Sequence, residues 1–275
     1  MKLLEYLESA VLLEGGAAIK SSSKVTQAEA RALIPDLLVK VMKVLKLPKA
    51  KIKAIGSAGN KPNADDMSGD IDIAVEIDRD AVEKALPELA YDGKSYKAMK
   101  GINIYSFGAE HGKKIVQIDL MPVDNIKYAE WAYQANPTDL QQGLKGAQRN
   151  ELFFAIAKHA YHKVLKTGKD GKPLEVERYF YDLGKGLMSG VQTRAGKKKD
   201  KKNFTTTGKK IITNDPAKIT KLLFGAGVKP SDVATFNGAL AVIKSDSFPY
   251  PEKRDEILDM ARKGIVKKGL KVPKF

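Results

Sequence analysis

The chain has 275 residues, of which 43% are hydrophobic and 29% are charged, and its 48 Lys and Arg outnumber its 33 Asp and Glu to give a formal net charge of +15. This apolar content excludes a largely disordered chain and is enough for a sizeable core, divided between two domains. The absence of cysteine excludes disulfide bonds and thiolate zinc sites, and the basic excess favours a polyanionic partner such as nucleic acid.

The first sixteen residues, MKLLEYLESAVLLEGG, are apolar at helical spacing but carry three glutamates. They lack the basic start, the unbroken apolar core and the small-residue cleavage site of a signal peptide. No uncharged apolar run approaches the roughly 18 to 20 residues that a membrane-spanning helix needs. We therefore expect a cytoplasmic protein with no membrane partner and no disulfide partner. The pattern leaves its oligomeric state open.

The first half of the chain alternates helical and strand patterns. Thr26 and Glu29 form a capping box before a long amphipathic helix that continues through residues 30–47. Alternating apolar residues then predict further elements: strands at 51–57, 70–77, 101–107 and 113–121, with a short helix at 78–89. This order predicts an α+β domain over residues 1–135.

Strand signals fade beyond Asn136, and helical patterns replace them. The segments that begin with a cap or a proline and continue amphipathically are 137–165, 215–225, 231–245 and 251–265. We expect a mainly α-helical domain over residues 136–275. It contains a Lys-rich stretch, RAGKKKDKKNFTTTGKK at 194–210, which is either a solvated loop or a contact for nucleic acid.

The predicted strand DIDIAVEI begins with two carboxylates, Asp70 and Asp72. Because side chains alternate along a strand, both project to one face, while Ile71 and Ile73 project to the other. Their Cβ atoms lie about 6 to 7 Å apart, so both carboxylates can converge on one hard cation. A divalent ion would turn their mutual repulsion into binding energy.

A third acid occupies the same kind of position in KKIVQIDLMPV. Ile118 and Leu120 fall on one face of this strand, and Gln117 and Asp119 fall on the other. If the two strands are neighbours, Asp119 completes a three-carboxylate site that can hold two Mg²⁺ ions about 3.5 to 4 Å apart.

A small-residue turn precedes these acids. Gly56 lets the backbone approach a phosphate closely, and the Ser57 hydroxyl and nearby N–H groups can bind a nucleotide triphosphate.

These residues together resemble a known family. Ile55-Gly56-Ser57, twelve intervening residues, Asp70-Ile71-Asp72-Ile73 and the later Ile118-Asp119-Leu120 are similar to the signature of the DNA polymerase β-like nucleotidyltransferase superfamily. The Ser-Gly-Asp entry to the acidic strand also resembles the turn in tRNA-terminal CCA-adding enzymes and poly(A) polymerases. The resemblance covers about residues 25–125 and does not indicate a particular subfamily.

The resemblance implies a mixed-sheet, palm-like catalytic domain that uses an NTP with two Mg²⁺ ions, or Mn²⁺ in their place. Asp70 and Asp72 would bind both metals, and Asp119 would bind the catalytic ion and help to activate the acceptor hydroxyl. Gly56 and Ser57 would hold the β- and γ-phosphates.

The helical half supplies candidates for the remaining contacts. Arg149, Lys158 and Lys163 are suited to hold the triphosphate or base, and Tyr161 to stack on the base. The alternative is that they are surface cations beside the core stripe of Leu152, Phe153 and Ile156. Residues that we interpret as playing no part in the metal site are Asp65, Asp66, Glu76, His159 and His162. The aromatic-rich segment 177–187 is interpreted as core packing, with nucleic-acid stacking as the alternative.

Four functions fit these patterns. The first is metal-dependent transfer of a nucleoside monophosphate from an NTP to the 3′ hydroxyl of an RNA, for example a tRNA, with release of pyrophosphate. The second is the same transfer to a protein, a small molecule or a second nucleotide, as in toxin-type, antibiotic-modifying or cyclic-oligonucleotide-producing branches. The third is a phage-type accessory protein with an unknown acceptor. The fourth, a non-enzymatic nucleic-acid-binding protein, explains the charge but not the three acids that share a face.

Overall fold

The computed structural model describes residues 18–194 and 204–275. It divides into two compact units, one that ends at Gly146 and one that runs from Ala147 to Phe275. The sequence predicts this boundary at residues 135 and 136. Among the described residues, no helix has both the length and the apolar character needed to cross a bilayer.

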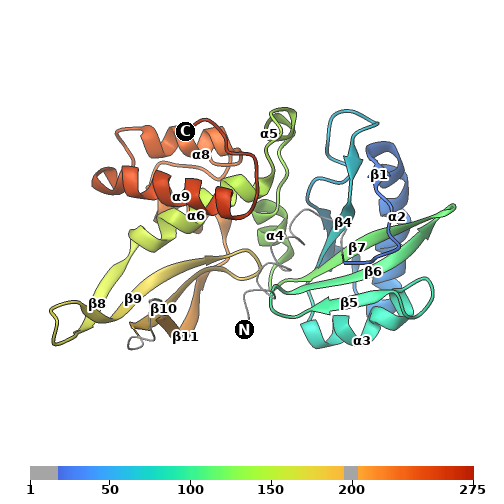
Figure 1. Cartoon of the computed structure of the whole chain (residues 1–275), viewed down its shortest axis with the longest axis horizontal. Coiled ribbons are helices and arrows are strands. Elements are labelled where there is room, and N and C mark those ends of the chain that lie inside the picture. Colours follow the sequence, from blue (N-terminus) through green and yellow to red (C-terminus); the bar gives the residue numbers. More distant parts are fainter. Residues whose placement is uncertain (1–17, 195–203) are drawn as a thin grey trace. The chain divides into compact units, whose positions relative to one another are not determined.

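The first unit is built on a five-stranded sheet with the strand order β2-β4-β7-β6-β5 (Figure 1). The strands are β2 (Ile52–Ile55), β4 (Asp70–Val75), β5 (Tyr96–Met99), β6 (Ile104–His111) and β7 (Lys114–Pro122). β4 and β7 are parallel, whereas every other neighbouring pair is antiparallel. The unit is therefore of mixed α+β class. Strands β2, β4, β6 and β7 overlap the segments in which the alternation predicts strands, whereas β5 lies in a segment for which the sequence predicts none.

Two helices cover one face of this sheet, α2 (Gln27–Leu45) and α3 (Arg79–Leu89). α2 begins at the predicted capping box, in which Thr26 Oγ1 accepts from the Glu29 N–H and Glu29 Oε2 accepts from the Thr26 N–H. Apolar residues of both helices pack on the strand residues that face them. This core includes Leu37, Val41, Val82, Leu86, Ile71, Ile73, Val75, Ile118 and Leu120. Burial of each large aliphatic side chain contributes about 1.5 to 3 kcal/mol.

The opposite face of the sheet carries the acids, because successive side chains of β4 and β7 point to alternate faces. Helix α4 (Ile126–Ala132) covers only one end of it, where Ala74, Met121 and Ala129 form a small apolar cluster. The short helix α5 (Pro137–Gln141) follows in the chain. The acidic residues thus lie beside an apolar support and on the side of the sheet away from the main core.

The loop that separates β2 from β4 is tied to the start of α2. A short strand β3 (Met67–Ser68) pairs with β1 (Val25–Thr26). The Gln27 side chain donates to Ser68 Oγ and accepts from the Lys61 N–H, while Arg31 donates to the carbonyl oxygens of Gly59 and Lys61. These bonds fix the path of the chain between the Gly-Ser turn and the acidic strand.

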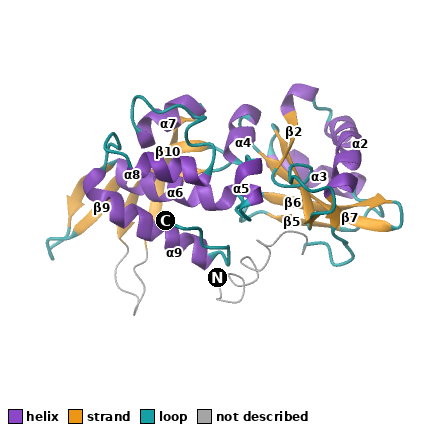
Figure 2. Cartoon of the chain, turned by 90° about the horizontal axis from the view of Figure 1, so that it is seen from above, coloured by secondary structure: helices purple, strands orange, loops and turns teal. Residues whose placement is uncertain are grey.

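The second unit contains a four-stranded antiparallel sheet with the order β11-β10-β9-β8. Its strands are β8 (His162–Thr167), β9 (Pro173–Asp182), β10 (Gly186–Arg194) and β11 (Phe204–Thr213). Four helices lie on one side of this sheet (Figures 1 and 2). They are α6 (Gly146–Ala160), α7 (Pro216–Phe224), α8 (Phe236–Lys244) and α9 (Arg254–Lys267), the last preceded by a 3-10 turn at Pro251–Lys253. In its core, the Phe153 ring packs on Tyr181 and Phe224, with centroids 5.2 and 4.8 Å apart.

The prediction of a mainly helical second half is wrong for residues 162–213. The helix predicted over 137–165 is two helices, and the chain enters β8 directly after α6. Val164 and Leu165 continue the apolar spacing of α6, which favours a longer helix, yet in the structure both are exposed on an edge strand. The Thr-, Val- and Ile-rich segments that follow form strands because β-branched residues suit a pleated sheet. Of the Lys-rich stretch, residues 204–210 lie in β11 and residues 195–203 lie outside the described residues.

Candidate metal centre

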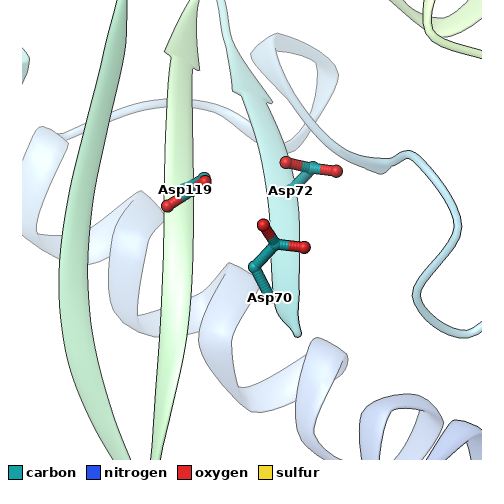
Figure 3. Close-up of side chains that lie close together, drawn as sticks. All are labelled: Asp70, Asp72 and Asp119. Carbon is teal, nitrogen blue, oxygen red and sulfur yellow. The ribbon is translucent and has the colours of Figure 1, made fainter. Parts of the chain in front are cut away.

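Three carboxylates converge on the face of the sheet that lies away from the main core. Asp70 and Asp72 come from β4 and Asp119 from β7, and in the parallel register of these strands Asp72 is the partner of Asp119. A ligand oxygen of each residue lies within 4.8 Å of those of the other two. Figure 3 shows the three side chains directed toward one another. The structure thus brings together the three residues that the alternation of two separate segments predicts to share a face.

The electrostatics of this cluster are unfavourable without a counter-charge. Burial, with the charges of Asp70 and Asp119, raises the pKa of Asp72 well above its usual range. Burial and the charge of Asp70 raise the pKa of Asp119 to about 6, although the hydrogen bond from Gln117 and the nearby Ser106 hydroxyl act in the opposite direction. Carboxylate oxygens are the ligands that Mg²⁺ and Mn²⁺ prefer, and this spacing suits one or two such ions. The residues present therefore fit a hard divalent cation.

Gln117 fixes the orientation of Asp119. Its Nε2 atom donates to Asp119 Oδ1 over 2.9 Å, and its Oε1 atom accepts from the backbone N–H groups of Ala18 and Ile19. Both Gln117 and Asp119 are buried, with 2% and 5% of their surfaces exposed. Sequence alternation places Gln117 on the same face as Asp119, but its partners near residue 18 could not be read from the pattern.

The Gly-Ser turn lies against the carboxylates. β2 pairs with β4 so that Ile55 is the partner of Asp72, and Gly56 follows with a φ of +75°. A Cβ atom built on Gly56 would lie 2.3 Å from Asp72 Oδ2, so the site tolerates only glycine without rearrangement. The turn is closed by Asn60, which donates from its backbone to Ser57 O and from its side chain to Gly56 O. The predicted phosphate-binding turn and the acids are therefore neighbours.

Two lysines near the acids have no place in the sequence motif. The positive charge of Lys145 acts to lower the pKa of Asp72. Lys61 lies in the loop between β2 and β4, and burial lowers its pKa while the charges of Asp66 and Asp70 act to raise it. Two backbone contacts place Lys145 near the acids. Gln134 forms a parallel bridge with Gly56, and the Gln134 carbonyl oxygen packs on Gly146, the residue after Lys145. No sequence signal indicated these lysines, because each is isolated in a loop.

The other predicted ligands belong to the second unit. Arg149 on α6 is fully buried, donates to the carbonyl oxygen of Ala234 and lies over the Phe153 ring at 5.6 Å from its centroid. It is part of the core, because no surface of its guanidinium is open to a nucleotide. Lys158 is exposed near the end of α6, whereas Lys163 lies on β8 rather than on a helix.

The acids interpreted as outside the site are not part of the cluster. Asp65 is exposed, and Asp66 accepts from the Asn63 amide. Glu76, expected to be solvated, is instead partly buried: it accepts from the Ile126 N–H at the start of α4 and pairs with Lys51.

Neither the comparison with models of protein families nor the comparison with curated proteins finds a match.

Proposed function

We propose that this protein is a metal-dependent nucleotidyltransferase, which transfers a nucleoside monophosphate from an NTP to a hydroxyl acceptor and releases pyrophosphate. The observation that carries the proposal is the cluster of Asp70, Asp72 and Asp119 beside the Gly56–Ser57 turn. We infer the reaction class from the motif, which resembles that of the DNA polymerase β-like superfamily. The close approach of the Gly56–Ser57 turn to Asp72 supports this inference.

Each part of the site has a task in this reaction. Asp70, Asp72 and Asp119 would hold one or two Mg²⁺ ions, which supply positive charge for the attacking oxygen and the leaving pyrophosphate. The bend at Gly56 and the Ser57 hydroxyl would position the phosphates, because glycine leaves room for a close approach of the backbone.

The surrounding side chains complete the arrangement. Lys145 and Lys61 would offset the charge of the triphosphate, and Gln117 keeps Asp119 aimed at the ions. The acceptor oxygen would form a bond to the α-phosphorus and pass its proton to a carboxylate oxygen of Asp119. The bond from the α-phosphorus to the bridging oxygen of the pyrophosphate would break, and pyrophosphate would leave.

The distribution of charge favours a polynucleotide acceptor. Residues 1–146 contain 20 Lys and Arg against 20 Asp and Glu, whereas residues 147–275 contain 28 against 13. The entire net charge of +15 thus belongs to the second unit. An enzyme that modifies a protein, a small molecule or a second nucleotide has no need of such a unit, whereas an enzyme that binds an RNA does. We therefore propose an RNA 3′ end as the acceptor.

The test is incubation of the protein with α-³²P-labelled NTPs, Mg²⁺ and total RNA. We expect label in RNA, with the rate reduced about 10²- to 10³-fold or more in Asp72→Ala, because the variant lacks a ligand of the metal ions that stabilise the developing negative charge. Asp65→Ala is the matched control, since it removes an exposed acid from the adjoining loop. Label found in protein or in small molecules would identify the other acceptor class. Undiminished transfer by Asp72→Ala would contradict the proposed site.

A further inference from the structure

The second unit contains a cavity of about 350 Å³ whose lining is entirely basic. Five side chains line it: Lys158, His159, His162, Arg178 and Lys253. They come from the end of α6, the start of β8, the middle of β9 and the turn before α9. The volume lies at the lower end of the range for ligand pockets. Residues distant in sequence thus converge on one small cationic site.

Most of this charge has no acidic partner in the described parts of the chain. Glu256 pairs with Lys253 over 3.3 Å and approaches His159 Nδ1 at 3.8 Å. Lys158 and Arg178 form no ion pair with any described carboxylate. His162 and Arg178 are moreover direct partners across β8 and β9, so these two side chains lie next to each other on one face of the sheet.

The cavity also holds buried nitrogen atoms that lack hydrogen-bond partners. Arg178 Nε and His159 Nε2 are buried and have no hydrogen-bond partner in the described structure. Buried polar atoms are nearly always paired, so an unpaired one indicates a missing partner. Burial lowers the pKa of Arg178, and burial together with the charge of Arg178 lowers the pKa of Lys158. An oxyanion in the cavity would satisfy the donors and offset the charge at once.

We propose that this basic cavity binds a backbone phosphate of a single-stranded polynucleotide. Guanidinium, ammonium and imidazole groups are the usual donors to phosphate oxygens, and the lining contains no Phe, Tyr or Trp side chain on which a base could stack. Lys163 and Lys166 on the exposed edge strand β8 extend the positive charge beyond the cavity. Recognition would therefore be independent of base sequence.

The inference takes the nature of the ligand from the proposed function, but it does not need the acidic cluster to be active. Binding is measured in EDTA and without NTP, so it does not depend on metal binding or nucleotide binding at the acidic cluster. A protein that binds RNA through the cavity but transfers nothing would refute the proposed function and leave this inference intact. Nucleotide transfer to RNA that persists when RNA binding does not depend on the cavity would refute this inference and leave the proposed function intact.

The experiment is fluorescence anisotropy with a 20-nucleotide single-stranded RNA over a range of salt concentrations. We compare the full chain with Lys158→Gln, with Lys158→Gln/Arg178→Gln and with Lys218→Gln/Lys221→Gln. The last variant is the matched control, because it removes the same charge from exposed positions on α7. Lys158 is exposed, so its substitution keeps the test valid if replacement of Arg178 disturbs folding.

We expect the cavity double variant to lose at least tenfold in affinity and to flatten the salt dependence, whereas the control changes affinity less than twofold. Equal losses in both double variants would show a diffuse charge effect and overturn the inference. The absence of RNA binding by the unmodified chain would overturn it as well. Displacement of RNA by micromolar ATP, lost in the cavity variant, would identify a mononucleotide pocket and reject a polynucleotide phosphate.

Discussion

Gly56 and Asp72 are so close that a Cβ atom on Gly56 would lie 2.3 Å from Asp72 Oδ2. The Gly-Ser turn and the acidic strand are therefore coupled mechanically, because any side chain at residue 56 displaces a proposed metal ligand.

We predict that Gly56→Ala lowers transfer activity about 10²-fold, since it combines left-handed strain of about 1 to 2 kcal/mol with a displaced carboxylate. Gly112→Ala is the control, because Gly112 also has a positive φ but has open space where the methyl group would lie. Steady-state kinetics and thermal unfolding of both variants separate the two effects. Equal stability losses with equal activity losses would show that the effect is strain alone.

Asp72 should destabilise the metal-free protein. The pKa of Asp72 is raised in the folded state, because the fold disfavours the ionised carboxylate. The free energy of unfolding is therefore higher at low pH, and this contribution is lost as the pH rises through the pKa of the folded state. Asp72→Asn stays neutral, and we predict that it raises the Tm in EDTA at pH 7.5 by about 2 to 4 °C. It should also abolish the rise in Tm that Mn²⁺ gives the unmodified chain. Asp65→Asn should leave both values unchanged, and a lower Tm for Asp72→Asn in EDTA would refute the electrostatic account.

Gln117 is proposed as a positioning residue. We predict that Gln117→Ala lowers kcat about 10-fold and raises the Mn²⁺ concentration needed for half-maximal activity, because the carboxylate of Asp119 loses its orienting donor. The KM for NTP should change little. Gln141→Ala, at an exposed position at the end of α5, gives the baseline. A loss of activity that excess Mn²⁺ leaves untouched would indicate general destabilisation instead.

Lys145 is proposed to contact the triphosphate. We predict that Lys145→Ala raises the KM for NTP about 10- to 100-fold, as expected for one charge-assisted hydrogen bond of about 1.5 to 3 kcal/mol. Lys127→Ala on α4 is the control, because Lys127 is exposed and its substitution removes the same charge from the same unit. Equal kinetic effects in the two variants would place Lys145 outside the nucleotide site.

The sequence predicts the acidic face well, because the direction of each acidic side chain depends only on its neighbours within the same strand. Alternation within two strands fixes which way Asp70, Asp72 and Asp119 point, and the apolar residues between them require the core on the other side. The signal fails where non-local pairing decides the structure. Residues 162–167 pair with β9 although their apolar spacing continues α6, and Arg149 is buried although its charge suggests a surface position. Lys61 and Lys145 approach the acids only through the folded path of two loops, so no motif could contain them.

Anomalous X-ray scattering from crystals of the full chain soaked in Mn²⁺ tests the central claim most directly. Our account predicts one or two manganese peaks within about 2 to 2.5 Å of carboxylate oxygens of Asp70, Asp72 and Asp119, and no peak there in crystals of Asp72→Asn. Manganese bound elsewhere, with none between these three residues, would contradict it.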